Sequence, residues 1–430
     1  MVKSRRGQLF ILALITTVLV TLIAGCFPRN PIVNPPVTPV PSTAPAPPPP
    51  EELLEPPPAA YQPLYTELQA ELAHFEIVLD QRWDGSHGQT IWATELAYAN
   101  GNIGEVLLDA DSMARNRLLL DRLQAMGIKG VVLAVKYPLL KPDYPRSDEY
   151  LQFFKNIVAE CHSRDIKVLV ECGVVFAGTS YSSIQYDWSG YTTATLLQGV
   201  QDELVVIARE IKPDYLTLAN EPTTEENLTG LEISPAVWSD FISSTITKIG
   251  GSSGILLGAG TGTWENPAYI NTLYGMPGLD YIDLHIYPLN EDGLYLTRAL
   301  NAAMGAHNAG QRVTVSESWL YKASARELST GILDFETAIS RDVYSFWYPL
   351  DARFIRDIMD LGDAFKMDFV SFFWTRSFFA GLDYNRTPHN LTTLQYNRLI
   401  NQAFIRGVDE DTLSSLGRDF QEQISSRAGQ

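Results

Sequence analysis

The strongest constraint on the fold is a repeated alternation of short apolar runs with stretches of helical periodicity, which fills the chain from about residue 90 onward. Runs rich in β-branched and aliphatic residues indicate buried strands, and apolar residues at intervals of three or four indicate helices. The predicted strands are Trp92–Ala99, Gly130–Val135, Lys167–Val170, Tyr215–Ala219, Gly254–Gly260, Tyr281–His285, Val313–Ser316 and Phe369–Trp374. The predicted helices between them include Arg115–Met126, Glu149–Arg164, Thr193–Lys212, Pro235–Ile249, Leu296–Ala309 and Asp351–Lys366.

This alternation is typical of parallel strands joined by right-handed crossovers, with helices covering the sheet. Eight strand–helix units favour a closed (β/α)₈ barrel, or TIM barrel, over an open doubly wound sheet. No Gly-x-Gly-x-x-Gly follows the first strand and no Walker-type loop is present, so a nucleotide-binding open sheet has little support. An amphipathic stretch before the barrel predicts an N-terminal helical lead-in, with its apolar residues at Leu64, Leu68, Leu72, Phe75 and Leu79.

The first 25 residues have the arrangement of a secretory signal. Lys3, Arg5 and Arg6 precede an apolar run that ends in Leu-Ile-Ala-Gly before Cys26. That ending resembles the bacterial lipobox, which implies cleavage before Cys26 and a lipid on its sulfur as the membrane anchor. A retained transmembrane helix is the alternative, but the run of about 15 residues is shorter than the roughly 20 that a span needs. We therefore expect a lipid-anchored, extracytoplasmic protein of the bacterial cell envelope.

Proline dominates the segment between the anchor cysteine and the lead-in helix, from Pro28 to Pro58. Such a composition cannot bury a core and favours an extended stalk. The predicted organisation is thus a signal peptide over residues 1–25, a lipid-anchor cysteine and proline-rich linker over residues 26–60, and a barrel domain over residues 61–430.

The composition of the chain limits the classes of ligand and cofactor that it is expected to bind. The formal net charge of −18 argues against nucleic acid or another anionic polymer and favours a neutral substrate. The six histidines are scattered, with no His-x-x-x-His or Cys-x-x-Cys pair, so we expect neither a metal nor another cofactor. Cys161 and Cys172 are predicted to be buried free thiols. We expect a monomer.

Polar and aromatic residues gather where the predicted strands end, and the active site of such a barrel is built from the carboxyl ends of its strands. The fourth strand runs into Asn220, Glu221 and Pro222, residue types that sheets disfavour. The candidate residues at the other strand ends are Lys136, Trp264, His285, Tyr287, Glu317, Trp319 and Trp374.

Two glutamates at one rim point to a specific chemistry. Retaining cleavage of a glycosidic bond needs one protonated carboxyl beside the leaving oxygen and one carboxylate that attacks the anomeric carbon, about 5–5.5 Å apart. Strands four and seven lie on opposite sides of an eight-stranded ring, so Glu221 and Glu317 can converge across its mouth.

These residues resemble the paired motif of clan A glycoside hydrolases, the 4/7 superfamily of retaining (β/α)₈ enzymes, over roughly residues 92–410. The resemblance implies that Glu221 is the acid/base and Glu317 the nucleophile. It further implies that Asn220 binds the sugar 2-hydroxyl, that His285 and Tyr287 line the subsite, and that Trp374 is a sugar platform. Many members carry an arginine near the end of the second strand, where this chain has Lys136.

The assigned chemistry requires the pKa of Glu221 to rise, through partial burial and the charge of Glu317. Trp264, Trp319 and Trp374 could stack on sugars, or each could be a packing residue.

Alternatives remain open at this point. Glu221 could be a helix-start carboxylate and Glu317 a rim salt bridge. Glu171, after the third strand, is the more serious rival for the second carboxylate, and Asp283 could instead point into the barrel. The predicted function is a retaining β-glycoside hydrolase acting on a neutral oligo- or polysaccharide. The alternative is a non-catalytic carbohydrate-binding surface lipoprotein with the same fold.

Overall fold

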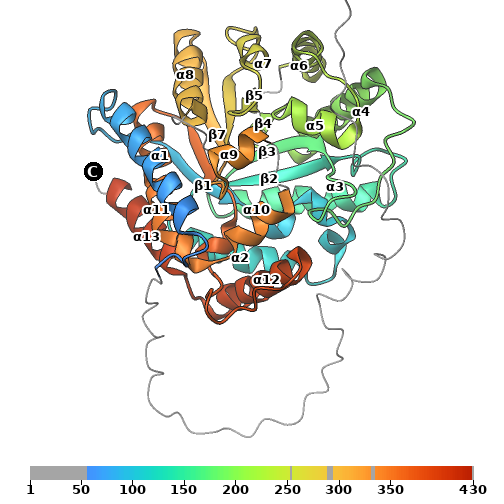
Figure 1. The fold of residues 1–430 in the computed structure, drawn as a ribbon. Coiled ribbons are helices and arrows are strands. Elements are labelled where there is room, and N and C mark those ends of the chain that lie inside the picture. Colours follow the sequence, from blue (N-terminus) through green and yellow to red (C-terminus); the bar gives the residue numbers. More distant parts are fainter. Residues whose placement is uncertain (1–55, 252–253, 288–293, 331–334, 429–430) are drawn as a thin grey trace, which may run out of the picture. The chain divides into compact units, whose positions relative to one another are not determined.

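The computed structural model describes residues 56–251, 254–287, 294–330 and 335–428. Its eight strands form a closed parallel barrel in chain order, with helices around the outside (Figure 1), which confirms the predicted (β/α)₈ fold. Cys26, the predicted signal and most of the predicted linker lie outside the described residues. Within the described ranges, none of the helices combines the length and the apolar character that a membrane span requires.

All eight strands occur where they were predicted, with shifted ends. They are β1 (Ile91–Glu95), β2 (Gly130–Tyr137), β3 (Lys167–Val174), β4 (Tyr215–Thr217), β5 (Leu256–Gly262), β6 (Tyr281–Ile286), β7 (Arg312–Ser318) and β8 (Phe369–Phe372). The prediction for β1 was four residues too long, because Ala97–Ala99 form a 3₁₀ turn after Glu95. Glu95 therefore lies at the rim, whereas the predicted bounds placed it inside a strand.

The predicted helices are present with small changes in their bounds. They are α1 (Gln62–Asp80), α2 (Ser112–Ala125), α3 (Ser147–His162), α4 (Thr193–Val206), α6 (Pro235–Ile249), α8 (Leu294–Asn308) and α11 (Tyr348–Ala364). The others that the structure describes are α5 (Pro222–Thr229), α7 (Pro267–Asn271), α9 (Ala325–Thr330), α10 (Phe335–Asp342), α12 (Thr393–Glu410) and α13 (Ser415–Ala428).

Local sequence explains several helix starts. Thr192 accepts a hydrogen bond from the Thr195 amide and closes a capping box at α4, and Thr392 does the same with Gln395 at α12. At α6, Ser234 caps the helix and Pro235 occupies the first helical position. These caps satisfy amides that have no partner within the helix.

The barrel interior is layered because side chains two apart on a strand share a face. The lower layer is apolar and consists of Ala93, Val132, Leu169, Tyr215, Tyr281 and Phe369. Two residues further along three of these strands lie Glu171, Thr217 and Asp283, all fully buried. The interior therefore changes from apolar to polar toward the carboxyl ends of the strands. Cys161 and Cys172 are buried free thiols, as predicted.

Helix α1 packs along α11 (Figure 1) and buries Leu68, Leu72, Phe75 and Leu79. Its first residues lie at the rim. The N-cap residue Tyr61 is in ring contact with Tyr344, Phe346 and Trp347 of the β7–α11 connection and with Tyr384 after β8. The lead-in helix thus begins beside the loops that follow β7 and β8.

Candidate active site

The β4–α5 turn places Glu221 at the mouth of the barrel. β4 ends at Thr217, Glu221 is the N-cap residue of α5, and Pro222 occupies the first helical turn. A proline is favourable there because its missing amide would have had no partner in the helix. The unusual end of this apolar run thus marks a strand-to-helix turn at the rim.

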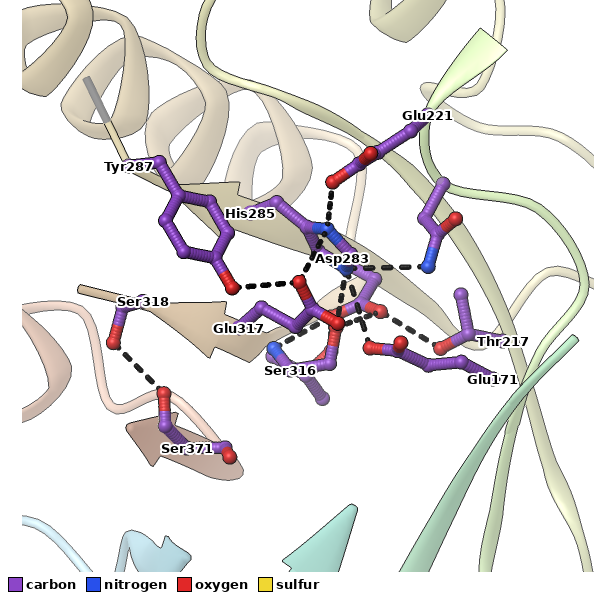
Figure 2. A network of polar contacts seen from close by, with 12 residues as sticks. Glu171, Thr217, Glu221, Asp283, His285, Tyr287, Ser316, Glu317, Ser318 and Ser371 are labelled. Carbon is purple, nitrogen blue, oxygen red and sulfur yellow. Dashed lines mark hydrogen bonds and ion pairs between the residues drawn. The ribbon is translucent and has the colours of Figure 1, made fainter. Parts of the chain in front are cut away.

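An irregularity in the β6–β7 pairing determines how Glu317 is presented. Leu284 is in register with Val315 but His285 is in register with Glu317, so Ser316 is an extra residue on β7. Bulges of this kind re-aim side chains and are common beside active sites. Here Ser316 turns to Asp283 and to the His285 ring, while Glu317 faces Tyr287 and the other side of that ring (Figure 2).

His285 lies at the centre of the site (Figure 2). Its Nδ1 is 2.6 Å from Oε1 of Glu221 and 3.4 Å from Oε2 of Glu317. Its Nε2 is 3.2 Å from Oε1 of Glu171, 3.0 Å from the Ser316 hydroxyl and 3.2 Å from the Asn220 amide nitrogen. One imidazole therefore contacts three carboxylates, which come from β3, the end of β4 and β7.

The two glutamates predicted to be catalytic lie close together. Because both approach the same ring nitrogen, at 2.6 and 3.4 Å, their nearest oxygens can be no more than about 6.0 Å apart. That limit is compatible with the spacing of about 5–5.5 Å in retaining glycosidases, and it is below the roughly 6.5–9.5 Å of inverting ones. Tyr287 donates a hydrogen bond of 2.7 Å to Oε2 of Glu317.

The charges of this cluster are coupled. Burial by itself would lower the pKa of His285, but Glu317, Glu171 and Glu221 raise it well above 6.5. The three carboxylates therefore favour the protonated form of the ring, in which both nitrogens can donate. Burial raises the pKa of Glu171, but His285 and Lys136 outweigh it and bring this pKa to about 2.

The pKa order of the two rim glutamates is the reverse of the order expected from sequence. Burial raises the pKa of Glu221, but the hydrogen bond and charge of His285 bring it below 4.5. Burial also raises the pKa of Glu317, and the charges of Glu171 and Glu221 add to it, so this pKa lies well above 4.5 despite His285. The contacts of the free site thus favour the ionised form of Glu221 and the protonated form of Glu317.

The two rival carboxylates have different positions. Asp283 points into the barrel, where it accepts hydrogen bonds from Thr217, Thr314 and Ser316. Burial raises the pKa of Asp283. Glu171 is fully buried beneath His285, yet it also lines the cleft described next. Asp283 is thus part of the polar interior, and Glu171 belongs to the site.

A small cleft with a cavity volume of about 30 Å³ opens beside Glu221. Its lining includes five of the predicted residues, which are Lys136, Asn220, Glu221, His285 and Glu317. A smaller hollow of about 10 Å³ adjoins Glu317 and is lined also by Glu95, Asn100 and Phe373. Glu317 borders both spaces. Tyr287 and the three candidate tryptophans do not line either one.

The three tryptophans differ from one another. Trp319 is only 2% exposed and its indole NH donates to Asp342, so the structure places it in the core and not on a sugar-binding surface. Trp264 is partly buried, edge-on to Tyr287 at 5.9 Å between ring centres. Trp374 is also partly buried and has a φ of 65°, a conformation that is rare for an aromatic residue. Strained backbone of this kind clusters at functional sites.

Sequence reasoning missed two carboxyl groups that line these spaces. Glu95 ends β1, and burial raises its pKa to about 7. Glu225 lies one helical turn after Glu221 on α5, and burial raises its pKa to about 7 as well. Correct bounds for β1 and the i, i+4 spacing from Glu221 are the signals that would have identified them.

One group of described residues could hold a metal ion. Ligand atoms of Glu171, His285 and Glu317 lie within 4.8 Å of one another. Both nitrogens of His285 already contact carboxylates, at 3.2 Å for Glu171 and 2.6 Å for Glu221, so the three residues form an ion-pair cluster in this structure.

No family model matches the sequence, and no curated protein does either. The fold is similar to that of solved GH5 glycoside hydrolases. A GH5_18 protein from Bifidobacterium longum subsp. infantis matches with a TM-score of 0.51 at 12% identity, over 78% of this chain and 79% of that one. GH5_18 from Streptomyces cattleya, solved in complex with GlcNAc, matches with a TM-score of 0.51 at 13% identity, over 80% and 81% of the two chains. At such identities the likeness establishes the shared barrel fold alone.

Proposed function

We propose that this protein is a retaining β-glycoside hydrolase that acts by double displacement on a neutral oligo- or polysaccharide. The observation that carries the proposal is the approach of Glu221 and Glu317 to a single nitrogen of His285 at the mouth of the barrel. The GH5-like fold and the cleft beside Glu221 support it.

In the first step a carboxylate oxygen of Glu317 bonds to the anomeric carbon as the glycosidic bond breaks, and Glu221 gives its proton to the leaving oxygen. In the second step Glu221, now ionised, takes a proton from water. The resulting oxygen nucleophile displaces Glu317 and restores both groups. The anomeric configuration is inverted twice and so retained.

The first step needs a proton on Glu221, whereas the contacts of the free site lower the pKa of Glu221 and raise that of Glu317. His285 can transfer this proton, because Nδ1 faces both carboxylates. The Nδ1 proton passes to Glu221 and the Glu317 proton passes to Nδ1, which leaves His285 charged as before. The Tyr287 hydroxyl then stabilises ionised Glu317 through its hydrogen bond.

The remaining predicted residues have supporting roles in this proposal. Asn220 lines the cleft next to His285 and is positioned to contact a sugar hydroxyl. Trp374 follows β8, where its ring is stacked with Tyr181 at 6.2 Å between ring centres and the Arg376 guanidinium lies 4.3 Å from its ring centre. For the location we retain the proposal made from sequence, a lipid-anchored protein on the extracytoplasmic side of a bacterial membrane.

The test uses Glu221→Gln and Glu317→Gln, which preserve shape and remove the ionisable groups. We expect each to lower kcat on aryl β-glycosides and β-linked oligosaccharides by at least about 10³-fold while the circular dichroism spectrum stays unchanged. Product anomers followed by proton NMR in the wild type should keep the β configuration. Full activity in either folded variant would refute the catalytic assignment, and glycan binding without release of reducing ends would favour the carbohydrate-binding alternative.

A further inference from the structure

A second set of polar groups borders the cleft beside Glu221. Lys136 on β2 is in register with Gly173 on β3, and Gly173 lies two residues after Glu171 on the inward face. Glu225 approaches the same place from α5. All four residues line the cleft that contains Glu221.

Lys136 lies among carboxyl groups and its charge lowers the pKa of Glu171 and opposes the rise in the pKa of Glu225, but it is in direct contact with neither. It is 8% exposed, and within the described ranges neither an ion pair nor a hydrogen bond reaches its ammonium group. Its Nζ atom lies 5.3 Å from the centre of the Phe176 ring, and the residue borders the cleft. A ligand in the cleft could therefore supply the hydrogen bonds that the described residues do not.

The carboxyl group of Glu225 also lacks a hydrogen-bond partner among the described residues. It is 6% exposed, and its carboxyl group forms no hydrogen bond with any residue that the structure describes. The Oε2 atom of Glu171 is also buried without a hydrogen-bond partner in that part of the chain. Three polar groups at one side of the cleft therefore have hydrogen-bonding capacity that the described residues leave unused, and the Glu171 Oε2 atom is the one among them that is fully buried.

Gly173 keeps the space between them open. A Cβ atom at this position would lie 3.3 Å from Oε1 of Glu225 and 3.6 Å from Nζ of Lys136. Glycine weakens a strand and is disfavoured there unless a ligand or another backbone approaches closely. Lys136 and Glu225 do not form an ion pair with each other across this gap.

We propose that Lys136, Gly173 and Glu225 form a sugar subsite that binds two neighbouring hydroxyl groups of a neutral saccharide. One hydroxyl oxygen accepts a hydrogen bond from Lys136, and the other hydroxyl donates to Glu225. The proposal rests on the proposed function for the identity of the ligand as a glycan, and it adds the residues that recognise it.

The charges around the gap favour a neutral diol over an ion. An anionic group bound at Lys136 would also face the carboxyl groups of Glu171 and Glu225, and a cationic group at Glu225 would face Lys136. A hydroxyl group both donates and accepts, so a pair of them satisfies Lys136 and Glu225 together.

Gly173→Ala is the sharpest variant, because it narrows the gap and removes no charge. The φ of Gly173 is not in the left-handed region, so alanine is compatible with the backbone. Lys136→Met and Glu225→Leu remove the donor and the acceptor. Gly190→Ala is the matched control, since Gly190 is exposed and a Cβ there meets nothing within 4 Å.

Each change is made in the Glu317→Gln background, and the Kd values for β-1,4-linked gluco- and manno-oligosaccharides are measured by isothermal titration calorimetry. We expect a rise in Kd of at least about tenfold for the three subsite variants and no change for the control. An unchanged Kd in folded Gly173→Ala and Lys136→Met would overturn the subsite, as would the absence of binding to every oligosaccharide.

Turnover by the otherwise unmutated protein separates the two proposals. If the oligosaccharide is bound through the subsite but never cleaved, the catalytic proposal fails and the subsite stands. If it is cleaved and the subsite variants leave Kd and KM unchanged, the catalytic proposal stands and the subsite fails.

Discussion

At the scale of single residues, the charge state of the site depends on contacts that only the folded chain reveals. The position of Glu221 and Glu317 at strand ends could be predicted, because sheets disfavour such residues and barrels collect them at one rim. The order of their pKa values could not. It depends on His285 lying 2.6 Å from Glu221, a contact set by the orientation of one ring.

Glu171 provides a test of this electrostatic coupling. It lies within 4.8 Å of Glu317 and its negative charge raises the pKa of Glu317. Glu171→Gln removes that charge and so favours the ionised form of Glu317, whose pKa falls. If ionised Glu317 is the nucleophile, the acidic limb of the kcat/KM profile should shift to lower pH by about one unit. His285, Lys136 and Glu221 are the other charged groups that face Glu317 across the site.

The measurement is kcat/KM against pH on an aryl β-glycoside. Glu232→Gln serves as the control because that side chain is exposed and lies outside the lining of the cleft. A shift of the acidic limb to higher pH in Glu171→Gln, or equal profiles in the two variants, would contradict the coupling.

At the scale of elements, the ends of each strand and its distance from the neighbouring strands depend on local backbone contacts. The hydrophobic pattern of the sequence does not show these contacts. The eight strands were found because parallel strands buried on both faces are nearly continuous apolar runs. Their ends were less certain, and the predicted bounds of β1 concealed Glu95 as a rim residue. The apolar pattern of the sequence does not show the irregularity between β6 and β7 that presents Glu317. A serine at position 316 is compatible with a regular strand as well as with the shifted register that the structure has.

Gly260 on β5 is one such close approach. A Cβ atom there would lie 1.5 Å from the backbone oxygen of Asp283 on β6, so Gly260→Ala must push the two strands apart. We expect this variant to lose about 3 kcal/mol or more of unfolding free energy, because the contact involves rigid backbone. Urea denaturation followed by tryptophan fluorescence measures the loss.

Gly190→Ala again provides the comparison, with an expected change within about 0.5 kcal/mol. Equal stabilities for the two alanine variants would show that β5 and β6 are packed less closely than described. A selective loss in Gly260→Ala would support the close packing beneath His285.

At the scale of the whole molecule, the repeated strand–helix unit determines the topology, which is why the barrel and the order of its strands could be predicted from the sequence. Elements outside that repeat were harder to predict. Helices α9 and α10 lie within a connection that had no clear apolar period, and α13 packs against α11 beyond the expected end of the barrel. Their positions depend on tertiary packing more than on local pattern.

The contribution of the lead-in helix can be measured by truncation. A chain that begins at residue 56 keeps Tyr61 and all of α1, so we expect its midpoint of thermal unfolding to equal that of the full-length protein. A chain that begins at residue 82 exposes the surface that Leu68, Leu72, Phe75 and Leu79 cover. Its free energy of unfolding should fall by several kcal/mol, because the burial of each of these side chains contributes about 1.5–3 kcal/mol.

Differential scanning calorimetry of the two truncated chains gives the comparison. Leu72→Ala in the longer chain is an intermediate case, with an expected loss of about 2–5 kcal/mol. If the chain lacking α1 melts with the full-length protein, the helix is an appendage and not part of the barrel core.

The start of α1 at the rim links the lead-in helix to the mouth of the barrel. Tyr61 contacts the loops after β7 and β8, on the side where Glu317 and the cleft lie. A change at Tyr61 can therefore reach the mouth of the barrel, although this residue comes well before the first strand in the chain.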